Sequence, residues 1–106
     1  MTNLPSVLLT IPGSVVAPSS FVDGPALWVN GKEILHRDAD GPYDIRLTRS
    51  VIRSYRDRLR ADSRIILRRS SSSDWIEVIG DDVSLVVELA TLAVAAHIPK
   101  KGQTPV

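Results

Sequence analysis

The sequence predicts an α+β fold: a single antiparallel sheet of about five to six strands with two main helices packed on one face. Short apolar segments separated by turn residues occupy the first 47 positions, whereas 48–61 has the apolar spacing of a helix and 83–97 is a longer segment that is apolar nearly all round. The elements therefore follow the order strands, helix, hairpin, helix. At 106 residues, 43% hydrophobic and 24% charged, the chain has the size and composition of one globular domain. We expect residues 1–98 to form that domain and 99–106 to be a flexible C-terminal tail that begins at Pro99.

The strongest local signal is the dipeptide Asn30-Gly31 between two apolar runs. Both residue types tolerate the positive φ of a type I′ turn, so strands are expected at 26–29 and 32–38. The pairs predicted across this turn are Val29 with Lys32, Trp28 with Glu33, Leu27 with Ile34, and Ala26 with Leu35.

The other elements follow from turn residues, caps and periodicity. Residues 43–47 alternate between apolar and polar side chains, as in a half-buried strand. Thr48 is a candidate N-cap for one helix that continues to about Ala61. The remaining elements expected are a helical turn at 6–11, strands at 15–17, 64–69 and 74–79, a serine connection at 70–73, and a helix at 83–97 capped by Asp81 or Asp82.

Some apolar residues of the sheet are not expected to lie under the two helices. Trp28 and Trp75 cannot both be covered together with Ile34 or Leu35 if the strands alternate regularly. This surface would face a cleft or a partner subunit, as in a homodimer formed through the sheet face. Alternatively, sheet twist or the N-terminal segment covers it.

Basic residues are concentrated in the middle of the chain. Nine of the thirteen Lys and Arg residues lie between Arg46 and Arg69 with only two acidic residues, giving a local charge of +7 in a chain of net charge +1. Helical spacing places four of them on one narrow line, here called the arginine row: Arg49, Arg53, Arg56 and Arg60. This row is either a solvated helix face, with its heads near Asp57, Asp62 or acidic groups of the sheet, or an anion-binding surface for phosphate, nucleic acid or an acidic protein.

Catalytic chemistry is sparsely represented. The chain has no cysteine, which excludes disulfides, thiolate metal ligands and thiol nucleophiles, and we expect no cofactor. His36 and Asp38 are two apart on a predicted strand, so they could share a face as metal ligands or as an acid–base pair. Two ligands are too few for a metal ion, and a structural role for His36 is the alternative.

The location expected from the sequence is the cytoplasm. The apolar run at 7–9 has no cationic region before it, unlike a signal peptide. The longest apolar stretch, 83–98, is shorter than the roughly 20 residues needed to cross a bilayer, so no membrane partner is expected.

Four motifs together resemble a family of small bacterial domains called the luciferase family or luciferase domain. The motifs are Pro12-Gly13, the segment 24–36 (GPALWVNGKEILH), the segment 44–48 (DIRLT) and the segment 73–78 (SDWIEV). The resemblance covers Pro12 to Ile98, and it implies no particular activity. Light emission is not implied, because the chain is far shorter than the flavin-dependent luciferase barrel of about 250 residues.

The chain departs from this family at the end of the third strand, where the family often has His-x-His and this sequence has His36-Arg37-Asp38. A paired-imidazole metal site would be weakened by that difference. More distantly, the order of elements is similar to the MmcQ/YjbR-type double-wing fold, for which DNA binding has been suggested. Similarity of fold alone does not transfer a function.

The resulting hypothesis is a binding or interaction module of the luciferase-domain family, with no catalytic residue assigned. Its candidate binding residues are Trp28, His36, Asp38, Arg46 and Trp75. One alternative is a nucleic-acid or phosphate-anion binder that uses the arginine row. Another is a small metal-dependent or acid–base enzyme built around His36 and Asp38, which would need a further polar group in a pocket.

Overall fold

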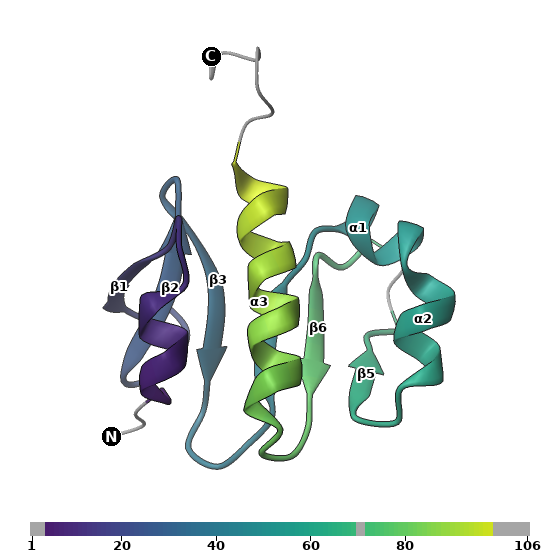
Figure 1. Ribbon diagram of the computed structural model, residues 1–106, viewed down its shortest axis with the longest axis horizontal. Helices are drawn as coiled ribbons and strands as arrows, with labels where there is room; N and C mark the ends of the chain where they lie inside the picture. Colours follow the sequence, from purple (N-terminus) through teal and green to yellow (C-terminus); the bar gives the residue numbers. More distant parts are fainter. Residues whose placement is uncertain (1–3, 70–71, 99–106) are drawn as a thin grey trace.

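The computed structural model describes residues 4–69 and 72–98 as one six-stranded antiparallel sheet accompanied by helices (Figure 1). This confirms the predicted α+β class. The predicted tail, 99–106, and positions 70 and 71 of the serine connection lie outside the described residues. The elements are η1 (Ser6–Thr10), β1 (Val15–Pro18), β2 (Pro25–Val29), β3 (Lys32–Arg37), β4 (Tyr43–Arg46), α1 (Arg49–Ser54), α2 (Arg56–Ala61), β5 (Ile65–Leu67), β6 (Trp75–Val78) and α3 (Val83–His97).

The strands lie in the order β1-β2-β3-β4-β6-β5, and every neighbouring pair is antiparallel. The first four strands form a meander. The chain then leaves the sheet through α1 and α2 and returns along the edge as β5 before β6 fills the position beside β4. The early meander and the late hairpin are therefore joined by the β4–β6 pair.

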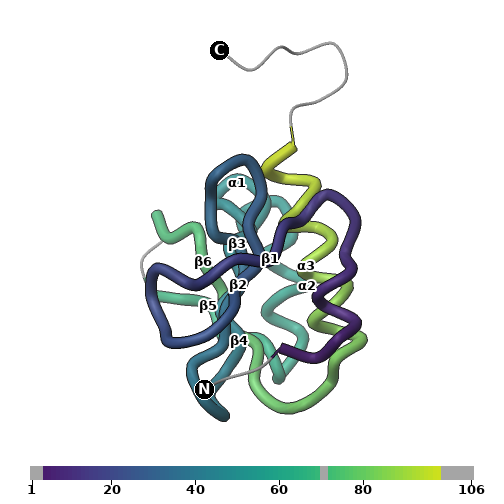
Figure 2. Tube along the Cα trace, turned by 90° about the vertical axis from the view of Figure 1, so that its left-hand side faces the viewer, coloured from purple at the N-terminus to yellow at the C-terminus, as the bar shows by residue number. Residues whose placement is uncertain are grey.

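Helix α3 covers the middle of the sheet, in contact with β3 and β4. Figure 2 shows α2, α3 and the N-terminal η1 on the same side of the strands. The side chain of Asp82 caps α3 by accepting a hydrogen bond from the Leu85 amide, as one of the two predicted caps. The buried face of α3 consists of Val86, Leu89, Ala90, Ala93 and Val94.

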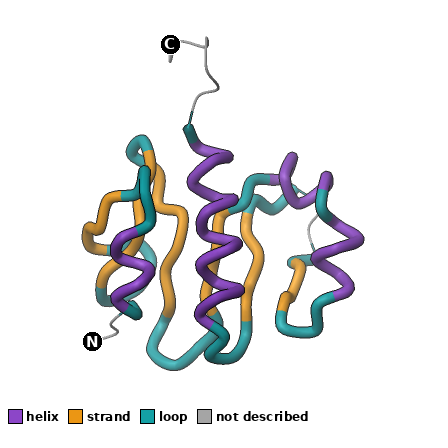
Figure 3. The backbone as a smooth tube through the Cα atoms, in the orientation of Figure 1, coloured by secondary structure: helices purple, strands orange, loops and turns teal. Residues whose placement is uncertain are grey.

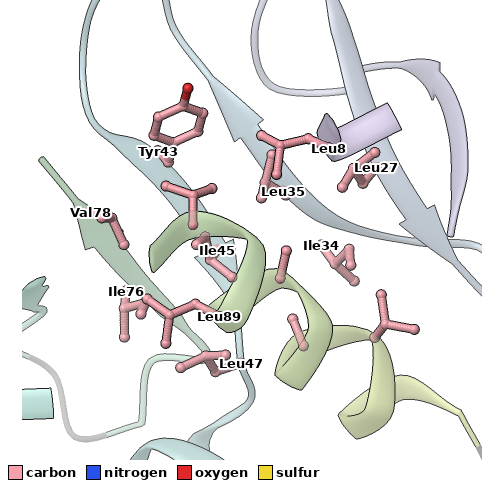
Figure 4. Close-up of a cluster of buried hydrophobic side chains, with 14 of the residues drawn as sticks. Leu8, Leu27, Ile34, Leu35, Tyr43, Ile45, Leu47, Ile76, Val78 and Leu89 are labelled. Atoms are coloured by element: carbon pink, nitrogen blue, oxygen red, sulfur yellow. The ribbon is translucent and has the colours of Figure 1, made fainter. Parts of the chain in front are cut away.

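The hydrophobic core lies between α3 and the sheet. Leu8 of η1 and Leu89 of α3 meet strand residues such as Leu35 and Ile45, and three of these four side chains are completely buried (Figure 4). Gly13 lies close to this helix, with φ +87°, and a Cβ there would come within 2.9 Å of Val94. Glycine therefore suits both the backbone conformation and the space at this position.

A β-bulge replaces the regular pairing predicted for the β2–β3 hairpin. Trp28 is opposite Glu33 as expected, but Leu27 is opposite Leu35 rather than Ile34, so Ile34 is the extra residue. Both Ile34 and Leu35 are fully buried. Regular alternation would have sent one of them to the other face, and the hydrophobic gain from burying both accounts for the bulge.

The single helix predicted from Thr48 to Ala61 is two short helices. Tyr55 separates α1 from α2 with φ −110° and ψ 16°, so the helix axis changes direction there (Figure 3). Each segment buries one apolar residue, Ile52 in α1 and Leu59 in α2. Beyond this change of direction, α2 packs against β5 at the sheet edge.

Candidate functional site

The face of the sheet opposite α3, called here the opposite face, carries most of the predicted binding residues. Residues that alternate with them along each strand lie in the core, so these side chains point away from α3. The predicted residues that share this face are Trp28 on β2, His36 on β3, Arg46 on β4 and Trp75 on β6.

Asp38 is not among them. Strand β3 ends at Arg37, and Asp38 is exposed in the following turn, where its carbonyl accepts a hydrogen bond from the Gly41 amide. The alternation that would have placed Asp38 beside His36 ends before it reaches Asp38. The pairing of His36 with Asp38, one alternative offered by strand spacing, is therefore not supported by the contacts of His36, because the carboxylates facing it come from Glu33 and Asp44.

His36 is a buried imidazole between two carboxylates. Its Nδ1 lies 2.9 Å from Oε2 of Glu33, and its Nε2 lies 3.0 Å from Oδ2 of Asp44. Burial lowers the pKa of His36, but the hydrogen bond and charge of Asp44 and the charge of Glu33 outweigh burial and raise the pKa above its ordinary value. The contact with Glu33 is an ion pair without good hydrogen-bond geometry. Since both nitrogens face carboxylates, the imidazolium is favoured over a metal-binding or basic imidazole.

The β-bulge explains how Glu33 and His36 come together. Three residues apart on a regular strand, they would point to opposite faces, but the extra residue Ile34 restores them to the same face. Sequence reasoning missed Glu33 and Asp44 as site residues. The available signal was the adjacent apolar pair Ile34-Leu35, which interrupts the alternation of this strand.

Glu33 also holds the loop between β1 and β2. Oε2 accepts a hydrogen bond from Ser19 Oγ at 2.6 Å, and Oε1 accepts one from the Ser20 amide at 2.7 Å. Ser19 Oγ in turn accepts from the amides of Phe21 and Val22. The buried carboxylate therefore fixes a turn whose next residue, Phe21, reaches over the opposite face.

Three rings form an aromatic cluster on this face. The ring of His36 lies 5.4 Å from that of Phe21 and 5.2 Å from that of Trp75, and the Phe21–Trp75 pair is edge-on at 5.8 Å. The guanidinium of Arg46 lies 4.7 Å from the centre of the Trp75 ring, within cation–π distance. Phe21 stays 62% exposed, so it is the member of the cluster most open to a partner. Phe21 could not have been found from the sequence by strand alternation or helical periodicity, because it lies in a loop.

Charges on the opposite face are largely paired within the protein. Asp44 is contacted by Arg68 as well as His36, at 3.0 Å from the guanidinium. Two buried donors differ, since Nε1 of Trp28 and Nε of Arg46 have no hydrogen-bond partner in the described part of the chain. Within residues 4–69 and 72–98, no group of three or more His, Asp or Glu side chains is placed to hold a metal ion.

The break at Tyr55 divides the arginine row into two pairs, one on α1 and one on α2, rather than the single line predicted. The electrostatic setting of the row differs from that of the opposite face. None of its four side chains forms a salt bridge with a described residue, and Arg49, Arg53 and Arg60 are exposed. Asp62, one expected partner, is bound by Arg64 instead, and the hydrogen bonds from Arg64 lower the pKa of Asp62 to about 2. The arginines that do form salt bridges are Arg37, Arg58, Arg64 and Arg68.

Comparisons of the chain with protein-family models, curated proteins and solved structures found no match. The resemblance to the luciferase-domain family and the distant similarity to the double-wing fold therefore remain predictions from the sequence. Among the described residues, no helix combines the length and the apolar character needed to span a lipid bilayer.

Proposed function

We propose that the protein is a binding module that holds nucleic acid through the phosphate groups of its backbone, using the arginine row on α1 and α2. The observation that supports this is the lack of acidic partners among the described residues for these four guanidinium groups, whereas Arg37, Arg58, Arg64 and Arg68 are ion-paired. On the opposite face, by contrast, Glu33 and Asp44 already compensate His36 and Arg68.

Arginine suits this role because its planar fork can donate two parallel hydrogen bonds to a phosphate. Within each short helix the two arginines are four residues apart, so they lie on the same side and about 6 Å apart along the axis. Four phosphate contacts would give a slope of log affinity against log salt of about −3.6 on duplex DNA. Binding would be independent of base sequence, since phosphate contacts position a protein without reading bases.

A titration of a fluorescein-labelled DNA duplex at two salt concentrations tests this proposal. The variant Arg53→Gln/Arg56→Gln should bind more weakly and reduce the salt slope by about 2, because two phosphate contacts are lost. The matched control, Arg58→Gln/Lys32→Gln, removes the same net charge, and should bind nearly as well as the parent protein. Equal weakening of both variants would show that DNA affinity depends on net charge and not on the arginine row. Failure of the folded parent to bind at low salt would refute the proposal.

A second candidate is a small-ligand site on the opposite face. It is favoured by the buried donors Trp28 Nε1 and Arg46 Nε, each of which has no hydrogen-bond partner among the described residues. NMR of the two indole N–H signals during titration with acetate or phosphate would test it. The Trp28 signal should shift, and unchanged signals from both indoles would refute the site. The homodimer through this face also remains a prediction, to be checked by sedimentation.

A further inference from the structure

A groove separates α2 from α3 on the helical side of the sheet. Helix α3 lies over β3 and β4, whereas α2 packs against β5, and β6 lies between (Figure 1). Neighbouring strands are about 4.8 Å apart, so the two helices are separated by roughly two and a half strand spacings, or about 12 Å. Helices that pack directly are about 8–10 Å apart. The side chains of α2 and α3 therefore leave space between them.

This groove has a volume of about 500 Å³ and a largely apolar lining. Its floor includes Leu59 and Leu89, which are almost completely buried, and its walls include partly exposed residues of α3. A volume of this size lies within the range of about 300–1,000 Å³ of small-molecule sites, which are also mostly apolar. The apolar lining residues are Leu59, Ile65, Leu85, Leu89, Leu92 and Ala95.

Charged residues at the groove indicate which end group a ligand would carry. Arg58 of α2 and Glu88 of α3 form a salt bridge across the groove, with side chains 69% and 53% exposed. Ion pairs between exposed side chains are weak, so an incoming carboxylate can replace Glu88 beside Arg58 at little cost. Tyr55 also lines the groove and offers a hydroxyl donor.

An ammonium end group fits the same groove less well. Arg58 would repel it, and the carboxylate of Asp62 is already bound by the guanidinium of Arg64. Only Glu88 would be left to pair with it. We infer that the α2–α3 groove is a binding site for a small amphiphile with a hydrocarbon body and one carboxylate, which Arg58 binds. This site is separate from the arginine row and does not depend on nucleic-acid binding.

Decanoate, titrated below its micelle concentration, is the probe for this inference. Calorimetry should show one site per chain, and backbone amide NMR shifts should concentrate on α2 and α3. Ala95→Trp places a large ring from an exposed position into the groove and should abolish binding. Arg58→Gln should weaken binding roughly threefold to fivefold, whereas Arg60→Gln, on the same helix but outside the groove lining, should leave it unchanged.

Circular dichroism of each variant establishes that it is folded, and Arg58→Gln tests the site even if Ala95→Trp does not fold. Decyltrimethylammonium, which has the same chain and the opposite charge, should bind at least threefold more weakly than decanoate. The inference is overturned if the cation binds as tightly as decanoate, if Arg60→Gln weakens binding as much as Arg58→Gln, or if the NMR shifts fall on the opposite face. Absence of decanoate binding to the folded parent protein would also overturn it.

Discussion

Oδ2 of Asp44 lies 3.0 Å from Nε2 of His36, across the β3–β4 pair on the opposite face of the sheet. The two residues are direct partners in the antiparallel register, and both side chains are mostly removed from solvent. A hydrogen bond between an imidazolium and a carboxylate is stronger than one between neutral groups. Protonation of His36 is therefore coupled to the stability of the sheet.

The first prediction concerns the pH dependence of stability. Because the folded-state pKa of His36 is raised above the ordinary 6.5, its contribution is complete below that value and is lost as pH rises through the raised pKa. We expect the free energy of unfolding, measured by urea denaturation, to decline from about pH 6 upwards for this reason. An NMR titration of the His36 ring should give a midpoint above 6.5.

His36→Gln is the control for this prediction. It should lower the free energy of unfolding at pH 6 by about 3 kcal/mol, because Glu33 remains buried after losing its cationic neighbour. It should also remove the decline that begins near pH 6. If the variant retains the same decline, another group is responsible and the assignment to His36 is wrong.

The second prediction concerns the loop that Glu33 holds. Glu33→Ala removes the acceptor for both Ser19 Oγ and the Ser20 amide, so the turn that carries Phe21 loses its attachment to β3. We expect faster hydrogen exchange at the Ser20 amide and a loss of about 2–3 kcal/mol in unfolding free energy. Glu77→Ala, which removes a carboxylate from β6, should leave that exchange rate unchanged. Equal protection of the Ser20 amide in the parent and Glu33→Ala proteins would contradict the contact.

Much of the fold followed from local sequence signals, because turn residues and alternation act over a few positions. Asn30-Gly31 located the hairpin, and Asp82 and the apolar run after it located α3. The bulge and the break at Tyr55 were not predictable in the same way. Both depend on where distant elements must pack, namely α3 above Ile34 and the sheet edge beneath α2.

The candidate site was likewise predictable only where local sequence rules apply. Strand alternation and pairing account for Arg46 and Trp75 on one face, whereas Trp28 and His36 share that face only because of the bulge. The carboxylates that bind His36 could not be found from its own neighbourhood in the sequence. Asp44 is brought to it by strand pairing, and Glu33 by the bulge, whereas the sequence offered only the nearby Asp38 as a candidate.

The third prediction tests the bulge itself. Since Ile34 and Leu35 are both fully buried, Ile34→Ala and Leu35→Ala should each cost about 2–4 kcal/mol of unfolding free energy. A regular hairpin would leave one of the two outside the core, and its substitution would then cost less. Val15→Ala, at a position 64% exposed, is the control and should change stability by less than about 0.5 kcal/mol. A cost below 1 kcal/mol at either buried position would exclude the bulged register.

The fourth prediction concerns Thr48, which joins β4 to α1 with φ 83° and ψ 150°. This conformation is unfavourable for a β-branched residue and costs about 1–3 kcal/mol. Its hydroxyl partly offsets that cost by accepting a hydrogen bond from the Val51 amide, which is the predicted N-cap. Thr48→Gly relieves the strain and loses only a few tenths of a kcal/mol of capping, so we expect it to stabilise the protein by about 1 kcal/mol.

Thr48→Ala separates the two effects at this position, because it removes the cap and keeps the side chain that makes positive φ unfavourable. It should destabilise the protein by about 1 kcal/mol, giving the order Gly, Thr, Ala from most to least stable in thermal and urea unfolding. Neither change touches the arginine row, so the affinity of both folded variants for a DNA duplex should equal that of the parent. If Thr48→Ala were more stable to unfolding than Thr48→Gly, the positive φ at the junction between β4 and α1 would be contradicted.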